Sequence, residues 1–200
     1  GFYTLGCKMN YAETETLSRK MQAAGYQQVK FTDVADYYVV NSCSVTESAN
    51  KKSRQAVRSA HRRNPNAKIV VVGCYAQLKP EEVGTVDGVA LVLGVDEKFN
   101  IVERLAEIES CDCASLHVSS IDSVENFSCA YSCSERTRAF LKVQDGCNYR
   151  CSYCTIPLAR GKSRNIEISS LVKQAEEIAS RGVKEIVLSG INIGDFGQTT

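Results

Sequence analysis

The sequence has no excess of charge of either sign and no long apolar run. Its 200 residues carry 24 basic and 23 acidic side chains, which excludes a wholly basic nucleic-acid coat protein and an acidic disordered tail. No run of about 18 apolar residues occurs, so we expect no membrane span. Residues 1–5 start like a strand and not like a secretory signal, which predicts a cytoplasmic protein. Because Gly1 stands where Met is expected, we expect a few leading residues to have been removed.

Histidine is scarce, whereas cysteine is abundant. The chain has two histidines, His61 and His117, but ten cysteines. With 44% hydrophobic residues, a chain of this length has enough apolar material for a core and does not need a disulfide framework. In a reducing compartment, clustered cysteines more often bind metal or perform redox chemistry. The cysteines therefore decide the functional interpretation.

Charge is unevenly distributed along the chain. Residues 48–80 contain eight basic residues and no acidic one, and residues 81–135 contain twelve acidic residues against two basic ones. Residues 136–164 return to a basic balance, with seven basic residues against Asp145 alone. Two basic stretches separated by an acidic one predict an anionic partner that meets only part of the surface.

Expected strands and helices alternate along the first half of the chain. The run Ile69–Val72 is continuously β-branched, as expected of a strand that is covered on both faces. Asn64-Pro65 ends the helix before it. The alternation predicts an α/β fold with a parallel sheet and helices on both faces. We expect strands at 2–5, 37–41, 69–72 and 89–93, and helices at 12–24, 47–63, 80–83 and 100–109.

Composition predicts two domains joined by a linker. The N-terminal parallel-sheet domain is expected at 1–108. Residues 109–135 are rich in Ser, Cys, Asp and Glu and predict a linker, with a short strand near 116–118. Residues 136–200 begin a second strand–helix–strand unit. Its expected elements are a strand at 138–143, a helix at 169–181 and a strand at 184–188.

Three separated cysteines occupy equivalent places in the predicted sheet. Cys7, Cys43 and Cys74 each follow a predicted strand. The carboxyl ends of parallel strands lie on one edge, where open α/β sheets bind ligands, so the three thiols can converge there. Gly6 and Gly73 precede two of them and allow the backbone to approach a bulky group. Three buried structural cysteines are the alternative interpretation.

The compact segment Cys147-Asn148-Tyr149-Arg150-Cys151-Ser152-Tyr153-Cys154 carries the sharpest motif. Three thiolates within eight residues, directly after a strand, can hold one face of a four-iron–four-sulfur cluster and leave the fourth iron without a protein ligand. Zinc is the rival, but no fourth cysteine or histidine follows nearby.

The spacing of Cys147, Cys151 and Cys154, with an aromatic residue before the last cysteine, resembles the radical S-adenosylmethionine (radical SAM) superfamily. This resemblance implies that the open iron binds S-adenosylmethionine, which a reduced cluster cleaves to a 5′-deoxyadenosyl radical. It implies that Tyr153 lies near the adenine, with packing beneath the loop as an equal alternative. It also implies that Gly190, in the loop that ends at Gly197, contacts the cofactor's amino group, although a plain glycine-rich turn fits as well.

Four ordered segments resemble the methylthiotransferase family within that superfamily. They are Thr4–Asn10, Asn41–Thr46, Val72–Gln77 and Gln144–Cys147. Gly6-Cys7-Lys8 and the segment 189–197 look most like the branch that acts on threonylcarbamoyladenosine in tRNA. The branches that act on isopentenyladenosine in tRNA and on an aspartate of a ribosomal protein are the close alternatives.

The family resemblance implies that Cys7, Cys43 and Cys74 hold a second, auxiliary four-iron–four-sulfur cluster, whose open iron bears the sulfur to be delivered. One S-adenosylmethionine would donate a methyl group and another would generate the radical. The implied enzyme is a transferase that adds a methylthio group to C2 of N6-threonylcarbamoyladenosine beside the anticodon. Its implied partners are the tRNA anticodon stem-loop and an electron donor of flavodoxin or ferredoxin type.

Basic residues recur on one predicted helix. Lys51, Arg54, Arg58 and Arg62 share a face by their three- and four-residue spacing, which fits contact with RNA phosphates or a plainly solvated face. Arg164, together with Lys162, follows the second cysteine group. We expect these two to contact substrate or the carboxylate of S-adenosylmethionine, with a surface role as the alternative.

A closed barrel of eight strand–helix units needs about 200 residues or more, so 136–200 is expected to hold only the first part of a radical SAM (β/α) barrel. The chain alone is then expected not to be fully active. Two other classes of protein stay open: an iron–sulfur electron carrier and a zinc-dependent nucleic-acid-binding module. The cysteines outside the family motifs are expected to be free thiols and not a zinc site; they are Cys111, Cys113, Cys129 and Cys133.

Overall fold

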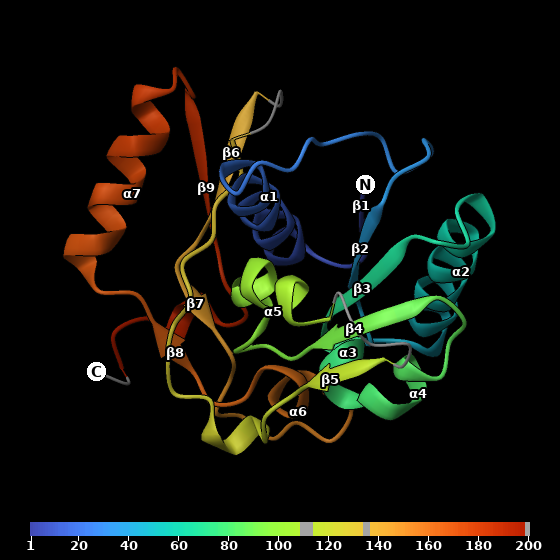
Figure 1. Ribbon diagram of the computed structural model, residues 1–200. Helices are drawn as coiled ribbons and strands as arrows, with labels where there is room; N and C mark the ends of the chain where they lie inside the picture. Colours follow the sequence, from blue (N-terminus) through green and yellow to red (C-terminus); the bar gives the residue numbers. More distant parts are fainter. Residues whose placement is uncertain (109–113, 134–136, 199–200) are drawn as a thin grey trace.

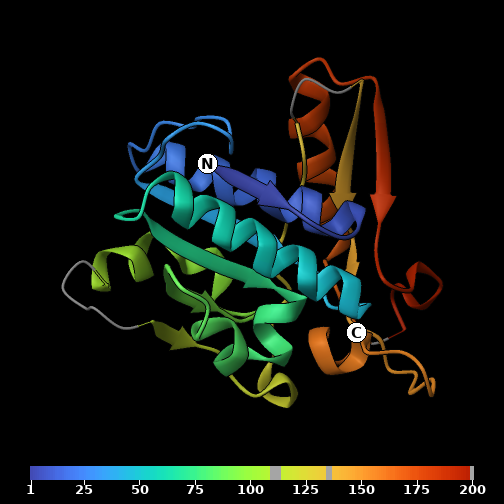
Figure 2. The same ribbon diagram turned by 90° about the vertical axis from the view of Figure 1, so that its right-hand side faces the viewer.

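The main sheet has five parallel strands in the order β1-β2-β3-β4-β5 (Figures 1 and 2). The computed structural model describes residues 1–108, 114–133 and 137–198. The predicted α/β fold with a parallel sheet is therefore confirmed. The strands are β1 (Phe2–Thr4), β2 (Tyr37–Ser42), β3 (Lys68–Gly73), β4 (Val89–Leu93) and β5 (Ser115–His117).

Helices cover both faces of this sheet (Figure 1). On one face, α1 (Lys8–Ala23) and α5 (Ile101–Glu107) bury apolar side chains against β2, β3 and β4. On the other face lie α2 (Glu47–Arg63), α3 (Cys74–Leu78) and α4 (Pro80–Gly84). Two apolar cores therefore enclose the strands, which explains why β3 reads as a continuous apolar run.

Most predicted boundaries are confirmed to within a residue or two, and α2 matches its prediction. Its N-cap is Thr46, whose hydroxyl accepts a hydrogen bond from the Ala49 amide at 3.2 Å. Helix α1 begins at Lys8, four residues before the predicted start at 12. Its first turn alternates the polar Lys8 and Asn10 with Met9 and Tyr11, so it shows no helical spacing of apolar residues. The helix consequently starts directly after Cys7.

The second part of the chain forms the predicted strand–helix–strand unit. Strands β6 (Arg138–Lys142) and β9 (Glu185–Ser189) pair in parallel, and α7 (Ile168–Ser180) connects to β9. The apolar core of this unit contains Ala139, Leu141, Val143, Ile166 and Ile178.

Three short elements of this part were not predicted. Strands β7 (Gln144–Asp145) and β8 (Arg164–Asn165) form a two-residue antiparallel pair, and α6 (Ile156–Arg160) has five residues. They are too short to show a periodic pattern. They nevertheless bracket the second cysteine group, with β7 before it and α6 after it.

The two parts of the chain pack against each other through α1 and β6 (Figures 1 and 2). Ala12 and Leu17 of α1 share one core with Phe140 of β6. Ala130 also joins that core, and its carbonyl accepts the amide of Lys142 at 2.9 Å. Residues from the range predicted as a linker therefore take part in the packing, and β5 from the same range pairs with β4.

The remaining helices are single 3-10 turns: η1 (Lys98–Asn100), η2 (Ile121–Ser123) and η3 (Ile193–Asp195). Across residues 1–108, 114–133 and 137–198, none of the helices has the length and apolar character needed to cross a membrane.

Candidate functional site

The first three predicted cysteines lie at the carboxyl ends of three adjacent strands. Cys43 directly follows β2, and Cys74 directly follows β3. These strands stay paired up to Ser42 and Gly73, the residues that precede the two cysteines. Cys7 follows β1 after a two-residue turn. Because β1, β2 and β3 are neighbours, the sheet brings this first cysteine group to one edge.

The first cysteine group is partly covered by protein. Cys43 and Cys74 are buried, whereas Cys7 is exposed. Burial raises the pKa of the Cys74 thiol, and the neighbouring Arg160 guanidinium opposes that shift.

Two glycines allow the close approach of these turns. Gly6 and Gly73 have φ angles of +101° and +95°, a region that L side chains rarely occupy. A Cβ on Gly6 would lie 3.2 Å from Cys43 Sγ, and one on Gly73 would overlap the Ser42 carbonyl oxygen. Glycine at these two positions therefore lets the turns before Cys7 and Cys74 pack closely against their neighbours.

Asn10 ties the turns of the first group together. Its Nδ2 donates to the carbonyls of Leu5 at 2.8 Å and Ser42 at 3.1 Å. Its Oδ1 lies 3.7 Å from Cys7 Sγ and accepts from Arg160 at 2.6 Å. One buried amide thus fixes the residues before Cys7 and Cys43, and it binds a guanidinium that comes from the second part of the chain.

The second cysteine group lies in the loop between β7 and α6. The Cys147 amide donates to the Gly161 carbonyl and the Cys154 amide to the Cys151 carbonyl, both at 3.0 Å. Cys147 is half-buried, and Cys151 and Cys154 are exposed. The hydrogen bonds wrap the loop, while two of its three thiols stay accessible.

Two cavities lie where residues near the first cysteine group meet the second part of the chain. One, of about 370 Å³, is lined by Val45, which follows Cys43 by two residues, and by Cys151 and Cys154. The other, of about 540 Å³, is lined by Cys7 and by Gly190 of the loop after β9. In addition, α3 packs on α6. The structure thus places the two groups on the same side of the molecule.

The three predicted cofactor contacts lie in different surroundings. Tyr153 is fully exposed, at 101% of its reference area, and lines the cavity shared with Cys151 and Cys154. Gly190 lines the cavity shared with Cys7. Arg164 is buried on β8, where its guanidinium donates to the carbonyls of Val124 at 3.3 Å and Lys162 at 3.1 Å. It therefore contacts protein carbonyls.

A group of five buried charged side chains, the buried ion cluster, lies between the two parts of the chain. Its members are Glu13, Lys98, Lys142, Asp145 and Arg160, each at most 2% exposed. The Glu13 carboxylate lies 2.7 Å from Lys98 Nζ, 3.2 Å from Lys142 Nζ and 3.1 Å from Arg160. Asp145 lies 2.6 Å from Lys142 Nζ and 3.0 Å from Arg160.

These contacts keep the two carboxyl groups ionised. Burial disfavours their charged forms, yet the surrounding cations outweigh it and hold the pKa values of Glu13 and Asp145 well below the ordinary range. Both carboxylates are therefore charged at neutral pH, whereas burial lowers the pKa of Lys98 despite the opposing effect of Glu13.

Sequence reasoning missed the buried ion cluster, although α1 carries a sign of it. Met9, Glu13 and Leu17 are spaced by four residues and share one helix face. A carboxylate inside such an apolar row is expected to be paired, since an isolated buried charge is costly. The identity of its partners depends on the second part of the chain and cannot be found locally.

The donors are compatible with iron–sulfur clusters. Within residues 1–108, 114–133 and 137–198, no three His, Cys, Asp or Glu side chains come together as ligands of a single metal ion. A four-iron cluster offers a separate iron to each thiolate, so its ligands need not converge on one point.

The other predicted residues fall outside this arrangement. Cys129 is exposed and Cys133 half-buried, both as free thiols, while Cys111 and Cys113 lie outside the described residues. In the basic row of α2, Arg54 is bound to Glu47 at 2.9 Å and Glu82 at 2.8 Å. Lys51, Arg58 and Arg62 are exposed.

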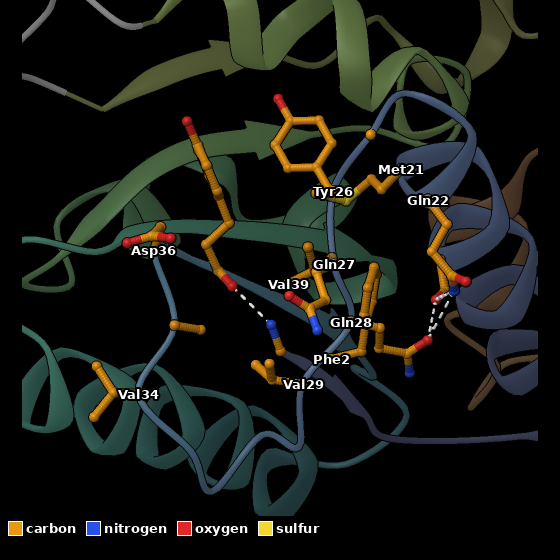
Figure 3. Close-up of a pocket in the computed structure, with 15 residues that line it drawn as sticks. Phe2, Met21, Gln22, Tyr26, Gln27, Gln28, Val29, Val34, Asp36 and Val39 are labelled. Atoms are coloured by element: carbon orange, nitrogen blue, oxygen red, sulfur yellow. Dashed lines mark hydrogen bonds between the residues drawn. The ribbon is translucent and has the colours of Figure 1, made fainter.

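A further cavity, of about 320 Å³, opens at the amino ends of β1 and β2 (Figure 3). Gly1, Tyr26 and Asp36 are among its lining residues, and Gln22 donates to Gln28 beside it at 2.9 Å. It lies at the opposite end of the strands from the first cysteine group and is a separate feature of the fold.

Both parts of the chain match models of known protein families. Residues 1–94 match the model of "Uncharacterized protein family UPF0004", and residues 141–196 match that of the radical SAM superfamily. The first range contains Cys7, Cys43 and Cys74, and the second contains Cys147, Cys151 and Cys154.

Similarity to individual proteins extends over nearly the whole chain. The chain is 40% identical over 98% of its length to the threonylcarbamoyladenosine tRNA methylthiotransferase MtaB of Bacillus subtilis, and 41% identical over 98% to that of Aquifex aeolicus. It is 28% identical over 96% to the tRNA-2-methylthio-N(6)-dimethylallyladenosine synthase of Bacteroides thetaiotaomicron. These alignments cover 44%, 48% and 43% of the respective relatives, so the chain spans a little under half their length. By its two domain matches and these relatives, the chain belongs to the radical SAM methylthiotransferase family.

Proposed function

We propose that the complete protein containing this chain is an enzyme that adds a methylthio group to C2 of N6-threonylcarbamoyladenosine, next to the anticodon of tRNA. The observation that carries this proposal is the identity of 34–41% to five MtaB proteins, against 28% to the dimethylallyladenosine synthases. The packing of α3, whose first residue is Cys74, on α6, which begins two residues after Cys154, supports it, since sulfur and radical must reach one carbon.

Two four-iron–four-sulfur clusters are part of the proposal. The first cysteine group, Cys7, Cys43 and Cys74, would hold the auxiliary cluster. Cys147, Cys151 and Cys154 would hold the cluster that binds S-adenosylmethionine. Together the groups would supply the sulfur and a radical that removes hydrogen from an unactivated C–H bond.

The protein's own residues would bind and orient the cofactor. Tyr153 is exposed beside Cys154, which suits stacking on an adenine. Gly190 lines a cavity of about 540 Å³ with Cys7, which suits a backbone contact to a bound amino group. Arg164 would contact the cofactor's carboxylate from a guanidinium that donates to two protein carbonyls and lies 3.8 Å from Asp145.

The tRNA anticodon stem-loop is the proposed partner on the side of α2. Its exposed Lys51, Arg58 and Arg62 suit phosphate contacts. Arg54 does not count among them, because its guanidinium bridges Glu47 and Glu82. A flavodoxin- or ferredoxin-type protein would deliver electrons. A cytoplasmic location suits an enzyme that acts on tRNA and that has free thiols of its own.

We also propose the division into residues 1–108, 109–135 and 136–200. Strand β5 then lies in the connecting range but completes the sheet of the first domain. The third range would be the first part of a (β/α) barrel, since it forms a parallel strand pair with one helix.

The test is the mass of modified nucleosides in tRNA from cells that lack the complete gene. The methylthio group of threonylcarbamoyladenosine should be lost and should return with the native gene. Cys74→Ala should fail to restore it, whereas Cys129→Ala, a matched change of an exposed cysteine outside the family motifs, should succeed. A methylthio group that persists in the deletion strain refutes the substrate assignment.

Metal content provides a second readout. The anaerobically reconstituted complete protein should bind about eight iron and eight sulfide per chain if two such clusters form. Cys74→Ala should retain about half of both, and Cys129→Ala should retain all. Formation of 5′-deoxyadenosine on reduction separates the proposed enzyme from an electron carrier. A colourless protein that contains only zinc contradicts the proposal.

A further inference from the structure

The buried ion cluster contains more positive than negative charge. The cations Lys142 and Arg160, joined by Arg164 at 3.8 Å from Asp145, face the carboxylates of Glu13 and Asp145. Lys98 is left out of this count, because burial lowers its pKa even though its Nζ lies 2.7 Å from Glu13. An uncompensated buried charge is expensive, so this arrangement calls for a further anion nearby.

The first cysteine group is the nearest place for that anion. The Arg160 guanidinium donates to Asn10 Oδ1 at 2.6 Å, and the same oxygen lies 3.7 Å from Cys7 Sγ. Its helix, α6, packs on α3, whose first residue is Cys74. This cation therefore lies beside the first cysteine group.

Arg160 also joins segments that are distant in the sequence. It donates to Asn10 at 2.6 Å and to Glu13 at 3.1 Å, on the helix that follows Cys7. It donates to Asp145 at 3.0 Å, two residues before Cys147. Its own helix, α6, begins two residues after Cys154. A single side chain therefore bonds to the elements that carry both cysteine groups.

Charge balance connects these observations. An oxidised four-iron–four-sulfur core bound by three thiolates carries net negative charge, and the potential of such a cluster depends on its net surrounding charge and on hydrogen bonds to its sulfurs. The Arg160 cation beside the first cysteine group has the sign needed to compensate it. A lysine at this position would keep the charge but lose the planar set of donors that reaches Asn10, Glu13 and Asp145 together.

We infer that Arg160 is a positioning residue that locks the first cysteine group against the radical SAM loop and supplies the balancing positive charge for the auxiliary cluster. This inference rests on the proposed function, because it requires a cluster at Cys7, Cys43 and Cys74. It adds a specific role for a residue outside both cysteine groups.

The experiment measures the reduction potential of the auxiliary cluster by spectroscopic titration of the complete protein. Replacing Cys147, Cys151 and Cys154 by Ala leaves the auxiliary cluster as the one observed. In that background we compare native Arg160 with Arg160→Lys and Arg160→Gln. The matched control is Arg138→Gln, which removes the same charge from a half-exposed pair with Glu185 at the far end of β6.

Arg160→Gln should shift the reduction potential to more negative values. The reduced cluster is more negative than the oxidised cluster, so loss of the nearby cation destabilises the reduced form more. Arg160→Lys should shift it by less than half as much, and Arg138→Gln should leave it within error. Loss of the cluster from Arg160→Gln but not from Arg160→Lys also supports the inference, since it shows that the cation is required.

An unchanged potential in Arg160→Gln overturns the inference, as does an equal shift in Arg138→Gln. Loss of the cluster from both Arg160 variants refutes the charge-balancing role and supports the locking role, because the positive charge of lysine is then not sufficient. A parent protein that binds no cluster at Cys7, Cys43 and Cys74 refutes the proposed function too. If the parent protein binds the cluster but its reduction potential is the same with and without Arg160, only the role given to this residue is refuted.

Discussion

Removing the charge of Glu13 should weaken the whole fold, because this carboxylate is the centre of the buried ion cluster. Glu13→Gln keeps the size of the side chain but leaves Lys98, Lys142 and Arg160 with Asp145 as the one remaining carboxylate of the cluster. Breaking a buried ion pair from one side costs about 3–5 kcal/mol. Since 1 kcal/mol moves the midpoint by about 2–4 °C in a chain of this size, the melting temperature should fall by roughly 6–20 °C.

The assay is urea and thermal unfolding of the cluster-free protein at pH 7, followed by circular dichroism. Glu107→Gln is the matched control, because its carboxylate is half-exposed and pairs with Arg104 at the surface. That change should cost less than about 1 kcal/mol. A difference between the two variants then reports burial of the ion pairs and not the chemical change from Glu to Gln.

A second variant tests the cause. Within the cluster, the ion pair of Lys98 is with Glu13. Lys98→Met should therefore lower the free energy of unfolding less in the Glu13→Gln variant than in the native protein. The double variant is expected to recover about 1–3 kcal/mol relative to the sum of the single changes. If Glu13→Gln unfolds within about 1 kcal/mol of the native protein, the electrostatic account of this interface is refuted.

Three further predictions test other parts of the structure. Gly73→Ala should destabilise by more than Gly25→Ala, because both have positive φ but a Cβ on Gly73 meets the Ser42 carbonyl and one on Gly25 meets nothing within 4 Å. The φ angle alone costs about 1–3 kcal/mol, and the difference in unfolding free energy measures the close approach. Stability should fall with acid, because the folded pKa values of Glu13 and Asp145 lie below their ordinary values of 4.5 and 3.8. Their contribution is complete above about pH 4.5 and is lost as the pH falls further; a flat unfolding free energy between pH 5 and 3 contradicts this. Lys51→Gln should weaken binding of an anticodon stem-loop and lower its salt dependence by about one unit of slope, measured by titration at several salt concentrations; an unchanged slope removes this residue from the interface.

Local patterns predicted the repeating elements well, because their cause is local. The continuous apolar run around Ile69–Val72 depends on burial of both faces of one strand, and β3 occupies 68–73. The helix over 47–63 is bounded by a capping threonine and by Asn64-Pro65, so its limits can be read directly. The first turn of α1 and the five-residue α6 lack such a pattern, and the sequence did not predict them.

The sequence by itself determined the identity and order of the six motif cysteines and the strands that most of them follow. It could do so because strand ends and a compact C-x3-C-x2-C spacing are properties of short segments. It did not show Arg160, Glu13 or Asn10 as parts of the site. Their partners lie up to 150 residues away along the chain, and only the packing of α1 on β6 brings them together. The tertiary structure alone decided that cations outnumber carboxylates beneath the first cysteine group, since charge balance at a buried point depends on every element that meets there.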